Sequence, residues 1–161
     1  MVYLLLIFTL ATLGFLLAEL GRGWSLTAQR AKETELLFIG QQFAQALSSY
    51  KARTPQGTPE APQRLEDLLE DRRFPFIVRH LREIPRDPMT GLRDWGLALQ
   101  DGRIVAVHSL SERQPLRQGM LPEYVSVKNE EGRAYRKWFF VPVAASPGPG
   151  IGATSGENPQ Q

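Results

Sequence analysis

Residues 1–18 read MVYLLLIFTLATLGFLLA and contain no charged side chain; only Thr9 and Thr12 interrupt the apolar run, and the first charge is Glu19. An α-helix of this length spans roughly 27 Å, close to the hydrocarbon thickness of a bilayer. A helix in a soluble core usually has a polar stripe, which this run lacks. A secretory signal peptide starts with basic residues, and none precedes the run. The sequence therefore predicts a membrane-inserted helix, with a cleaved signal peptide as the less favoured alternative.

The helical pattern continues beyond this run, because residues 25–53 contain no proline and become amphipathic. The apolar positions on one side are Leu36, Ile39, Phe43, Ala46, Leu47 and Tyr50. Three of them, Leu36, Phe43 and Tyr50, lie seven residues apart and are predicted to pack the helix against the rest of the chain. One continuous helix over residues 1–53 would be about 80 Å long. The sequence TPQG at 54–57 should end it, since proline disfavours helical geometry in the residue before it.

Small residues form a strip on the apolar half of this helix. Ala11, Gly14 and Ala18 are spaced by three and four residues and share one face, where a neighbouring helix could approach closely. They are equally compatible with an ordinary membrane helix, so both interpretations stay open. Gly21 and Gly23 each cost about 1 kcal/mol relative to alanine in a helix, and we expect bending or local melting there.

The remaining sequence predicts a small α+β domain. Residues 64–71 (RLEDLLED) form a short amphipathic helix. Its acidic side chains could be imagined as paired catalytic carboxylates or calcium ligands, but this spacing is more typical of a solvated helix face. The four acidic residues are Glu66, Asp67, Glu70 and Asp71.

Three strands and one tight turn follow. Residues 95–99 and 104–109 have strand character and are joined by an Asp-Gly turn at 100–103. Residues 135–141 form a third strand, residues 112–132 are irregular, and residues 144–161 are predicted to be disordered. The expected organisation is a transmembrane half-helix (1–20), an amphipathic half-helix (21–54), an α+β domain (55–143) and a tail (144–161). The expected fold is a long N-terminal helix packed on a small antiparallel sheet.

Composition excludes several functions. The 19 basic and 17 acidic residues nearly cancel, so the pI of about 9.1 does not indicate a nucleic-acid-binding surface. The absence of cysteine excludes disulfides, thiolate metal ligands and thiol nucleophiles. Two histidines, His80 and His108, are the only imidazoles. His108 and Ser109 are adjacent, so they point to opposite faces of a strand and cannot form a nucleophile–base pair. We expect no catalytic residue and no cofactor.

Several short stretches, in this order and spacing, resemble type IV pilins, and among them the major pseudopilin of type II secretion. They are VYL at 2–4, QRA at 29–31, ELLFIG at 35–40, RLEDLLED at 64–71, DPMTG at 87–91 followed by Trp95, and VHSLS at 107–111. The resemblance covers residues 2–141. It implies a type IV pilin-like fold and a structural subunit of a filament that takes part in protein export.

The resemblance also implies a location and a set of partners. The protein would be a single-pass protein of the bacterial inner membrane with its domain in the periplasm. Its partners would be itself and other pseudopilins, the inner-membrane secretion platform and the lipid bilayer, with no nucleic acid. A prepilin peptidase joins them if a leader lies upstream of Met1. The alternative is a bitopic inner-membrane adaptor whose domain binds a partner without forming filaments.

The sequence departs from the family at three places. The basic leader ending in glycine does not precede Met1, so we expect either a mature start or an upstream start site. Leu5 stands where many pilins have a glutamate that pairs with a neighbour's N-terminal amine, which weakens the expectation that the chain polymerises alone. Residues 111–117 match the calcium-binding loop of major pseudopilins but offer only Glu112 as a carboxylate, so no metal site is expected.

Overall fold

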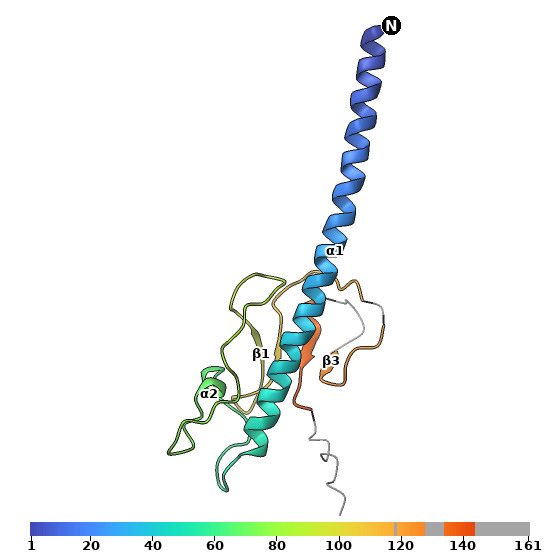
Figure 1. Ribbon diagram of the computed structural model, residues 1–161. Helices are drawn as coiled ribbons and strands as arrows, with labels where there is room; N and C mark the ends of the chain where they lie inside the picture. Colours follow the sequence, from blue (N-terminus) through green and yellow to red (C-terminus); the bar gives the residue numbers. More distant parts are fainter. Residues whose placement is uncertain (118, 128–133, 144–161) are drawn as a thin grey trace, which may run out of the picture.

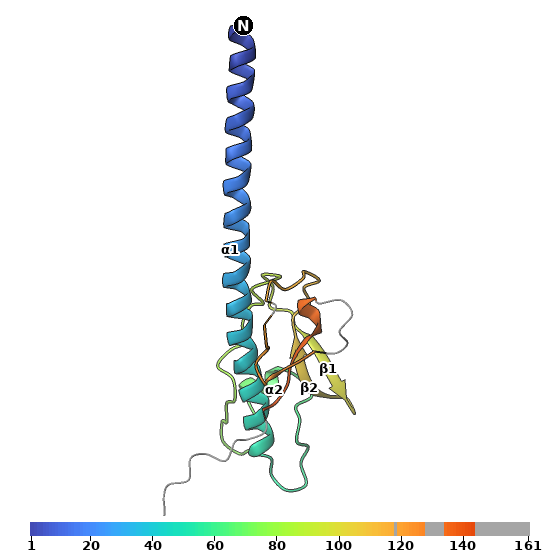
Figure 2. The same ribbon diagram turned by 90° about the vertical axis from the view of Figure 1, so that its right-hand side faces the viewer.

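The computed structural model describes residues 1–117, 119–127 and 134–143, except for the side chains of residues 17–24. The fold is α+β, with one long N-terminal helix and a small antiparallel sheet. Helix α1 (Val2–Ala52) has 51 residues, and its first half projects far beyond the rest of the molecule (Figures 1 and 2). The domain packs along its second half. The tail predicted at 144–161 lies outside the described residues.

Helix α1 runs through Gly21 and Gly23 without a break, so the expected local melting there is wrong. Two glycines cost about 2 kcal/mol relative to alanine, and helical hydrogen bonds on both sides carry the helix across them. The helix ends where the sequence predicts. The backbone N–H of Thr54 donates to Lys51 O, and Gly57 takes the left-handed backbone geometry of the turn that follows (φ 80°).

The sheet has four strands in the order β1-β2-β4-β3, all antiparallel. Strands β1 (Gly96–Gln100) and β2 (Arg103–His108) form the predicted hairpin. Asp101 and Gly102 both have positive φ (52° and 73°), as a two-residue turn between twisted strands requires. A bulge between Ala98 and Leu99 shifts the register of this hairpin.

The third predicted strand is shorter than expected, and a further strand was not predicted. Strand β4 (Trp138–Phe140) pairs with β3 (Val125–Val127), which lies in the stretch expected to be irregular. The first residues of the expected strand form a 3₁₀ turn, η1 (Tyr135–Lys137). Tyr135 and Arg136 donate their N–H groups to the carbonyls of Arg113 and Ser111, so this segment pairs with the preceding loop and not with the sheet.

Helix α2 (Glu66–Leu69) is also shorter than the predicted 64–71. The Asp67 carboxylate accepts hydrogen bonds from the N–H groups of Gln63 and Arg64, which fixes the start of the helix. At its other end Glu70 is extended, and Asp71 turns inward. The prediction of a solvated acidic face holds for the exposed Glu66 and Glu70 and is wrong for Asp71, which is 2% exposed.

Candidate functional site

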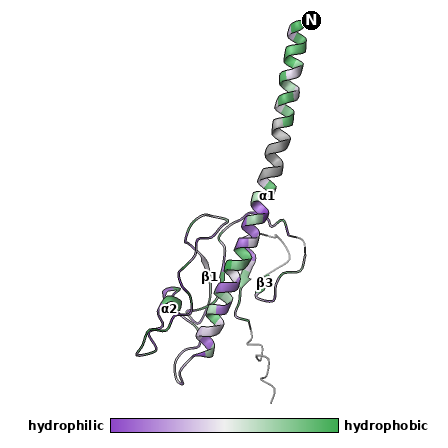
Figure 3. Ribbon diagram, viewed as in Figure 1, coloured by the Kyte–Doolittle hydropathy of each residue, from purple (hydrophilic) through white to green (hydrophobic). Residues whose placement is uncertain are grey.

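The projecting half of α1 exposes a continuous apolar surface. Every large apolar side chain from Met1 to Leu16 is exposed by 55% or more. Figure 3 colours most residues of this half as hydrophobic, whereas hydrophobic and hydrophilic residues alternate along the half beside the domain. Monomeric soluble proteins rarely expose contiguous apolar patches beyond a few hundred Å². Exposed apolar surfaces of this extent are typical of sites that contact lipid or another protein.

Within the residues whose side chains the structure describes, no helical segment is both long and apolar enough to cross a membrane.

The predicted small-residue strip lies on this projecting half. Ala11 and Gly14 are exposed, and a Cβ added at Gly14 would meet no atom within 4 Å. The side chain of Ala18 is outside the described residues. Within the described part of the subunit nothing covers Ala11 or Gly14, so both positions are open to contact with another molecule.

The three residues expected to hold the domain on its helix are all buried. Leu36, Phe43 and Tyr50 are 0%, 0% and 5% exposed and belong to the core cluster. Phe43 packs edge-on against Trp95, with ring centroids 4.9 Å apart. Close contact between helix and sheet also depends on Gly40, where an added Cβ would overlap the ring of Phe140. The periodicity indicated the apolar face, but it could not indicate which glycine faces strand β4.

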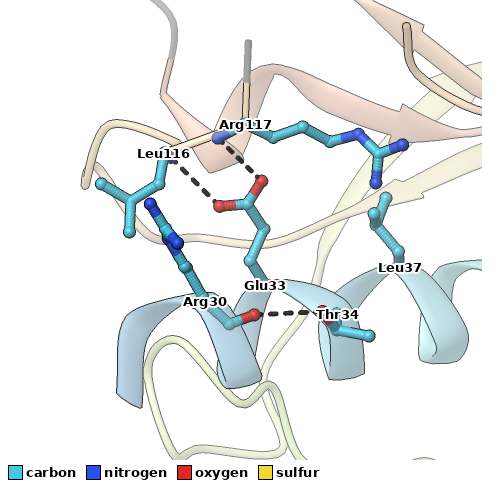
Figure 4. Close-up of a pocket in the computed structure, with 6 residues that line it drawn as sticks. All are labelled: Arg30, Glu33, Thr34, Leu37, Leu116 and Arg117. Carbon is cyan, nitrogen blue, oxygen red and sulfur yellow. Dashed lines mark hydrogen bonds between the residues drawn. The ribbon is translucent and has the colours of Figure 1, made fainter. Parts of the chain in front are cut away.

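A buried carboxylate fastens the domain to α1 at the end nearer the projecting half of the helix. Glu33 is 5% exposed. Its Oε2 and Oε1 accept hydrogen bonds from the backbone N–H groups of Leu116 and Arg117, both at 3.1 Å (Figure 4). The hydroxyl of Tyr135 donates a third hydrogen bond at 3.0 Å. Burial raises the pKa of Tyr135, so the hydroxyl keeps its proton and remains a donor. Three donors thus compensate one desolvated charge.

This cluster determines the conformation of the loop that the resemblance matches to a calcium site. The loop turns two N–H groups toward Glu33, and its one carboxylate, that of Glu112, pairs with Arg136 at 2.7 Å. Within the described residues there is no group of three or more histidine and carboxylate side chains that could hold a metal ion. A hollow of about 340 Å³ beside Glu33 is lined by Arg30, Glu33, Thr34, Leu37, Leu116 and Arg117.

A second buried polar cluster holds the C-terminal end of α1 against the domain. The Asp71 carboxylate accepts hydrogen bonds from Nε and Nη2 of Arg73 at 2.7–3.1 Å, and from the Arg73 backbone N–H at 3.0 Å. Arg73 also donates to the carbonyl of Tyr50, one of the last carbonyls of the helix, which have no partner within it. Its guanidinium lies 3.5 Å from the Tyr50 ring centroid.

His80 completes this cluster, and its contacts resemble a serine–histidine–aspartate arrangement. Its Nδ1 lies 2.9 Å from Ser49 Oγ and its Nε2 lies 3.2 Å from Asp71 Oδ2. The arrangement is poorly suited to catalysis, because Arg73 already neutralises Asp71 and the His80 side chain is fully buried. Burial lowers the pKa of His80, although Asp71 opposes that change.

His108 and Ser109 do not form a pair either. The Ser109 hydroxyl donates to Asp87 Oδ2 at 2.6 Å, and His108 packs against Phe139 with ring centroids 4.8 Å apart. Asp87 also accepts the N–H of Met89, which orders the DPMTG turn. These contacts stabilise the turn before β1.

Comparisons with protein-family models, with curated proteins and with solved structures found no match to this chain.

Proposed function

We propose that this chain is a filament subunit of the type IV pilin superfamily, a pseudopilin of a type II secretion pseudopilus, and not an enzyme. The observation that carries the proposal is the exposed apolar surface over residues 1–16 on a helix whose other half bears a small α+β domain. In the sequence this apolar run continues through Leu17 and Ala18 before the first charge. One helix would thus serve as the membrane anchor, the contact between subunits and the support of the domain.

The two polar clusters support this division of roles. Glu33 and Arg73 fasten the domain to α1 at two places about 17 helical residues apart, from Glu33 to Tyr50. At about 1.5 Å per residue, this separation is roughly 25 Å. The domain is therefore fixed to the helix and would follow it rigidly in an assembly.

Fractionation tests the anchor. The full-length chain should stay with bacterial membranes through high-salt and carbonate washing. Its domain should be digested by protease added to intact spheroplasts. A chain that washes off with carbonate would show that residues 1–18 do not insert. Protease resistance in intact spheroplasts would contradict the periplasmic location.

Cross-linking distinguishes a filament subunit from an adaptor. The chain has no cysteine, so single cysteines can be placed at exposed positions of α1 such as Glu35, Phe38 and Gln45. A linker that joins the thiol of one chain to an amine of another should give a ladder of self-adducts from a filament, because each chain then has one cysteine and several lysines. One heterologous band, with no ladder at any position, would favour the adaptor and contradict the filament.

A further inference from the structure

The end of the domain nearest the projecting half of α1 is formed by one loop and one stretch of the helix. Gln29 Nε2 donates to Gln114 O at 3.0 Å, and Glu33 accepts the two loop N–H groups described above. The loop at 111–117 therefore lies beside α1 at the point where the domain begins (Figures 1 and 2). We name this loop, together with residues 29–33 of the helix, the proximal end of the domain.

The proximal end carries exposed cations, which are Arg30, Lys32, Arg113 and Arg117. None of these side chains forms an ion pair within the described part of the chain. Arg30 and Arg117 line the hollow beside Glu33, and Figure 4 shows their guanidinium groups on opposite sides of its carboxylate. These two groups do not converge on one point, as a pocket for a single small anion requires. The cations are instead spread over a surface.

Nearby carboxylates do not cancel this positive charge. Glu33 is buried and accepts three hydrogen bonds, and Glu112 already belongs to an ion pair. Glu35, exposed close by on α1, offsets one of the four cations. The neighbouring stretches 84–94 and 128–133 each have two basic and two acidic residues in the sequence, which cancel. The proximal end therefore keeps a net positive charge.

The anchor sets the distance between the proximal end and the bilayer. The uncharged run ends at Ala18, and Trp24, a residue type that concentrates at membrane surfaces, follows six residues later. With the hydrocarbon boundary between these two residues, Gln29 lies about 8–17 Å beyond it along the helix. Headgroups fill about 5–8 Å of this distance. Their electric field extends a further Debye length, about 8–10 Å at physiological ionic strength. The cations of the proximal end are therefore within reach of the headgroups.

We propose that the proximal end of the domain binds the headgroups of anionic phospholipids while the subunit is anchored in the bilayer. The inference rests on the proposed function, because it requires the anchor to be inserted. The bilayer is the anionic surface that the geometry places opposite this end, and basic segments next to a membrane anchor are attracted to such a surface. A spread set of cations matches a layer of many phosphates, and each cation can meet a different headgroup.

Fluorescence quenching in vesicles tests this contact with the full-length chain. The chain has no cysteine, so one thiol-reactive fluorophore can be attached at Thr9→Cys in the anchor, at Gln114→Cys in the proximal end, or at Gln56→Cys beyond the C-terminal end of α1. The vesicles contain three parts phosphatidylcholine to one part phosphatidylglycerol, with a nitroxide on some headgroups. We expect at least twofold more quenching at Gln114 than at Gln56.

The charge of the lipid should control this quenching. In vesicles without phosphatidylglycerol, quenching at Gln114 should fall to the level at Gln56. It should fall in the same way at 1 M salt, where the Debye length is only about 3 Å. Quenching at Gln114 that is equally strong in neutral vesicles would overturn the recognition of anionic headgroups.

Removal of the cations provides a second measurement. One variant neutralises three cations of the proximal end, by Arg30→Gln, Arg113→Gln and Arg117→Gln. It should reduce quenching at Gln114 to the level at Gln56 and leave the thermal midpoint unchanged, since these side chains are exposed. The matched control neutralises three exposed cations beside α2, by Arg64→Gln, Arg72→Gln and Arg79→Gln, and should leave quenching unchanged. Equal effects of the two variants would overturn the assignment to the proximal end.

The label in the anchor separates this inference from the proposed function. A nitroxide on the lipid acyl chain should quench the fluorophore at Thr9. If it does so while the headgroup nitroxide leaves Gln114 unquenched, the headgroup contact is overturned and the anchor stands. Absence of quenching at Thr9 would overturn both.

Two further outcomes would assign the cations to another partner and overturn the proposal. One is quenching at Gln114 that falls when the chain is diluted in lipid, whatever the lipid charge, because the proximal end would then contact a second copy. The other is displacement by inorganic phosphate that exceeds displacement by sodium chloride of equal ionic strength, because the cations would then bind a single small anion. We expect neither.

Discussion

Arg73 and Asp71 form a buried ion pair in which the guanidinium approaches the carboxylate to 2.7 Å, with side chains 11% and 1% exposed. The same guanidinium donates to Thr54 Oγ1, Pro59 O and Tyr50 O. One side chain thus connects the end of α1, the loop after it and the segment after α2. Both charged groups therefore have hydrogen-bond partners, which a buried ion pair requires if it is to offset the loss of hydration.

Replacement of Arg73 by alanine should destabilise the domain by about 3–5 kcal/mol, because it removes the cation that pairs with the buried carboxylate of Asp71 and leaves only the contact with His80. Near-ultraviolet circular dichroism during thermal unfolding of the full-length chain in detergent measures this. Arg72→Ala is the matched control, since Arg72 is adjacent and exposed, and it should change stability by less than about 0.5 kcal/mol. Equal effects of the two variants would show that the pair contributes nothing specific.

Acid should destabilise the domain through Asp71. Burial alone would raise the pKa of Asp71, but hydrogen bonds from Arg73 and His80 outweigh it and lower the pKa from 3.8 to about 2. A depressed carboxyl pKa contributes stability that is present above pH 3.8 and is lost as the pH falls toward 2. The difference corresponds to about 2 kcal/mol. Unfolding midpoints measured between pH 5 and 2 should fall accordingly, and Asp71→Asn should make this dependence shallower.

Glu33→Gln should loosen the loop at residues 114–117. A glutamine side chain has one acceptor oxygen, and its NH₂ group would face an N–H donor that Glu33 now accepts. We expect the free energy of unfolding to fall by about 1–3 kcal/mol and the backbone amides of Leu116 and Arg117 to exchange their hydrogens faster. Glu35→Gln, at an exposed position of the same helix, is the control. Unchanged exchange at both amides would refute the role of Glu33.

Phe43→Ala should destabilise the domain by about 3–5 kcal/mol, the usual range for a fully buried phenylalanine. Phe38→Ala on the same helix removes an equal volume from a side chain that is 62% exposed, and should have little effect on the thermal midpoint. If Phe38→Ala costs as much as Phe43→Ala, the assignment of the two faces of α1 is wrong.

Gly14→Leu should reduce self-adducts and secretion and leave thermal unfolding of the domain unchanged, because nothing in the described part of the subunit contacts this position. Leu16→Phe adds bulk on another side of the same helix and should be tolerated. Normal secretion and a normal cross-linking ladder from Gly14→Leu would mean that the strip of small residues is not an assembly surface.

Local patterns in the sequence were sufficient for the elements that depend on near neighbours. The spacing of Leu36, Phe43 and Tyr50 indicated the face of α1 that is buried, because helical periodicity alone decides which residues share a face. Asp101-Gly102 indicated the hairpin, since few residue pairs accept two successive positive φ values. Residues 1–18 indicated an apolar helix by composition alone.

Only the tertiary structure decided how the polar residues are used. Asp71 resembles its exposed neighbours Glu66 and Glu70 in sequence, and it differs only because Arg73 and His80 meet it in space. Glu33 lies 83 residues before Leu116, and no local pattern couples a helix carboxylate to a loop so distant. Strand β3 exists because Trp138–Phe140 lies beside it to complete its hydrogen bonds. Helices and tight turns are determined by contacts within a few residues, whereas buried charges and short strands depend on partners that folding brings together.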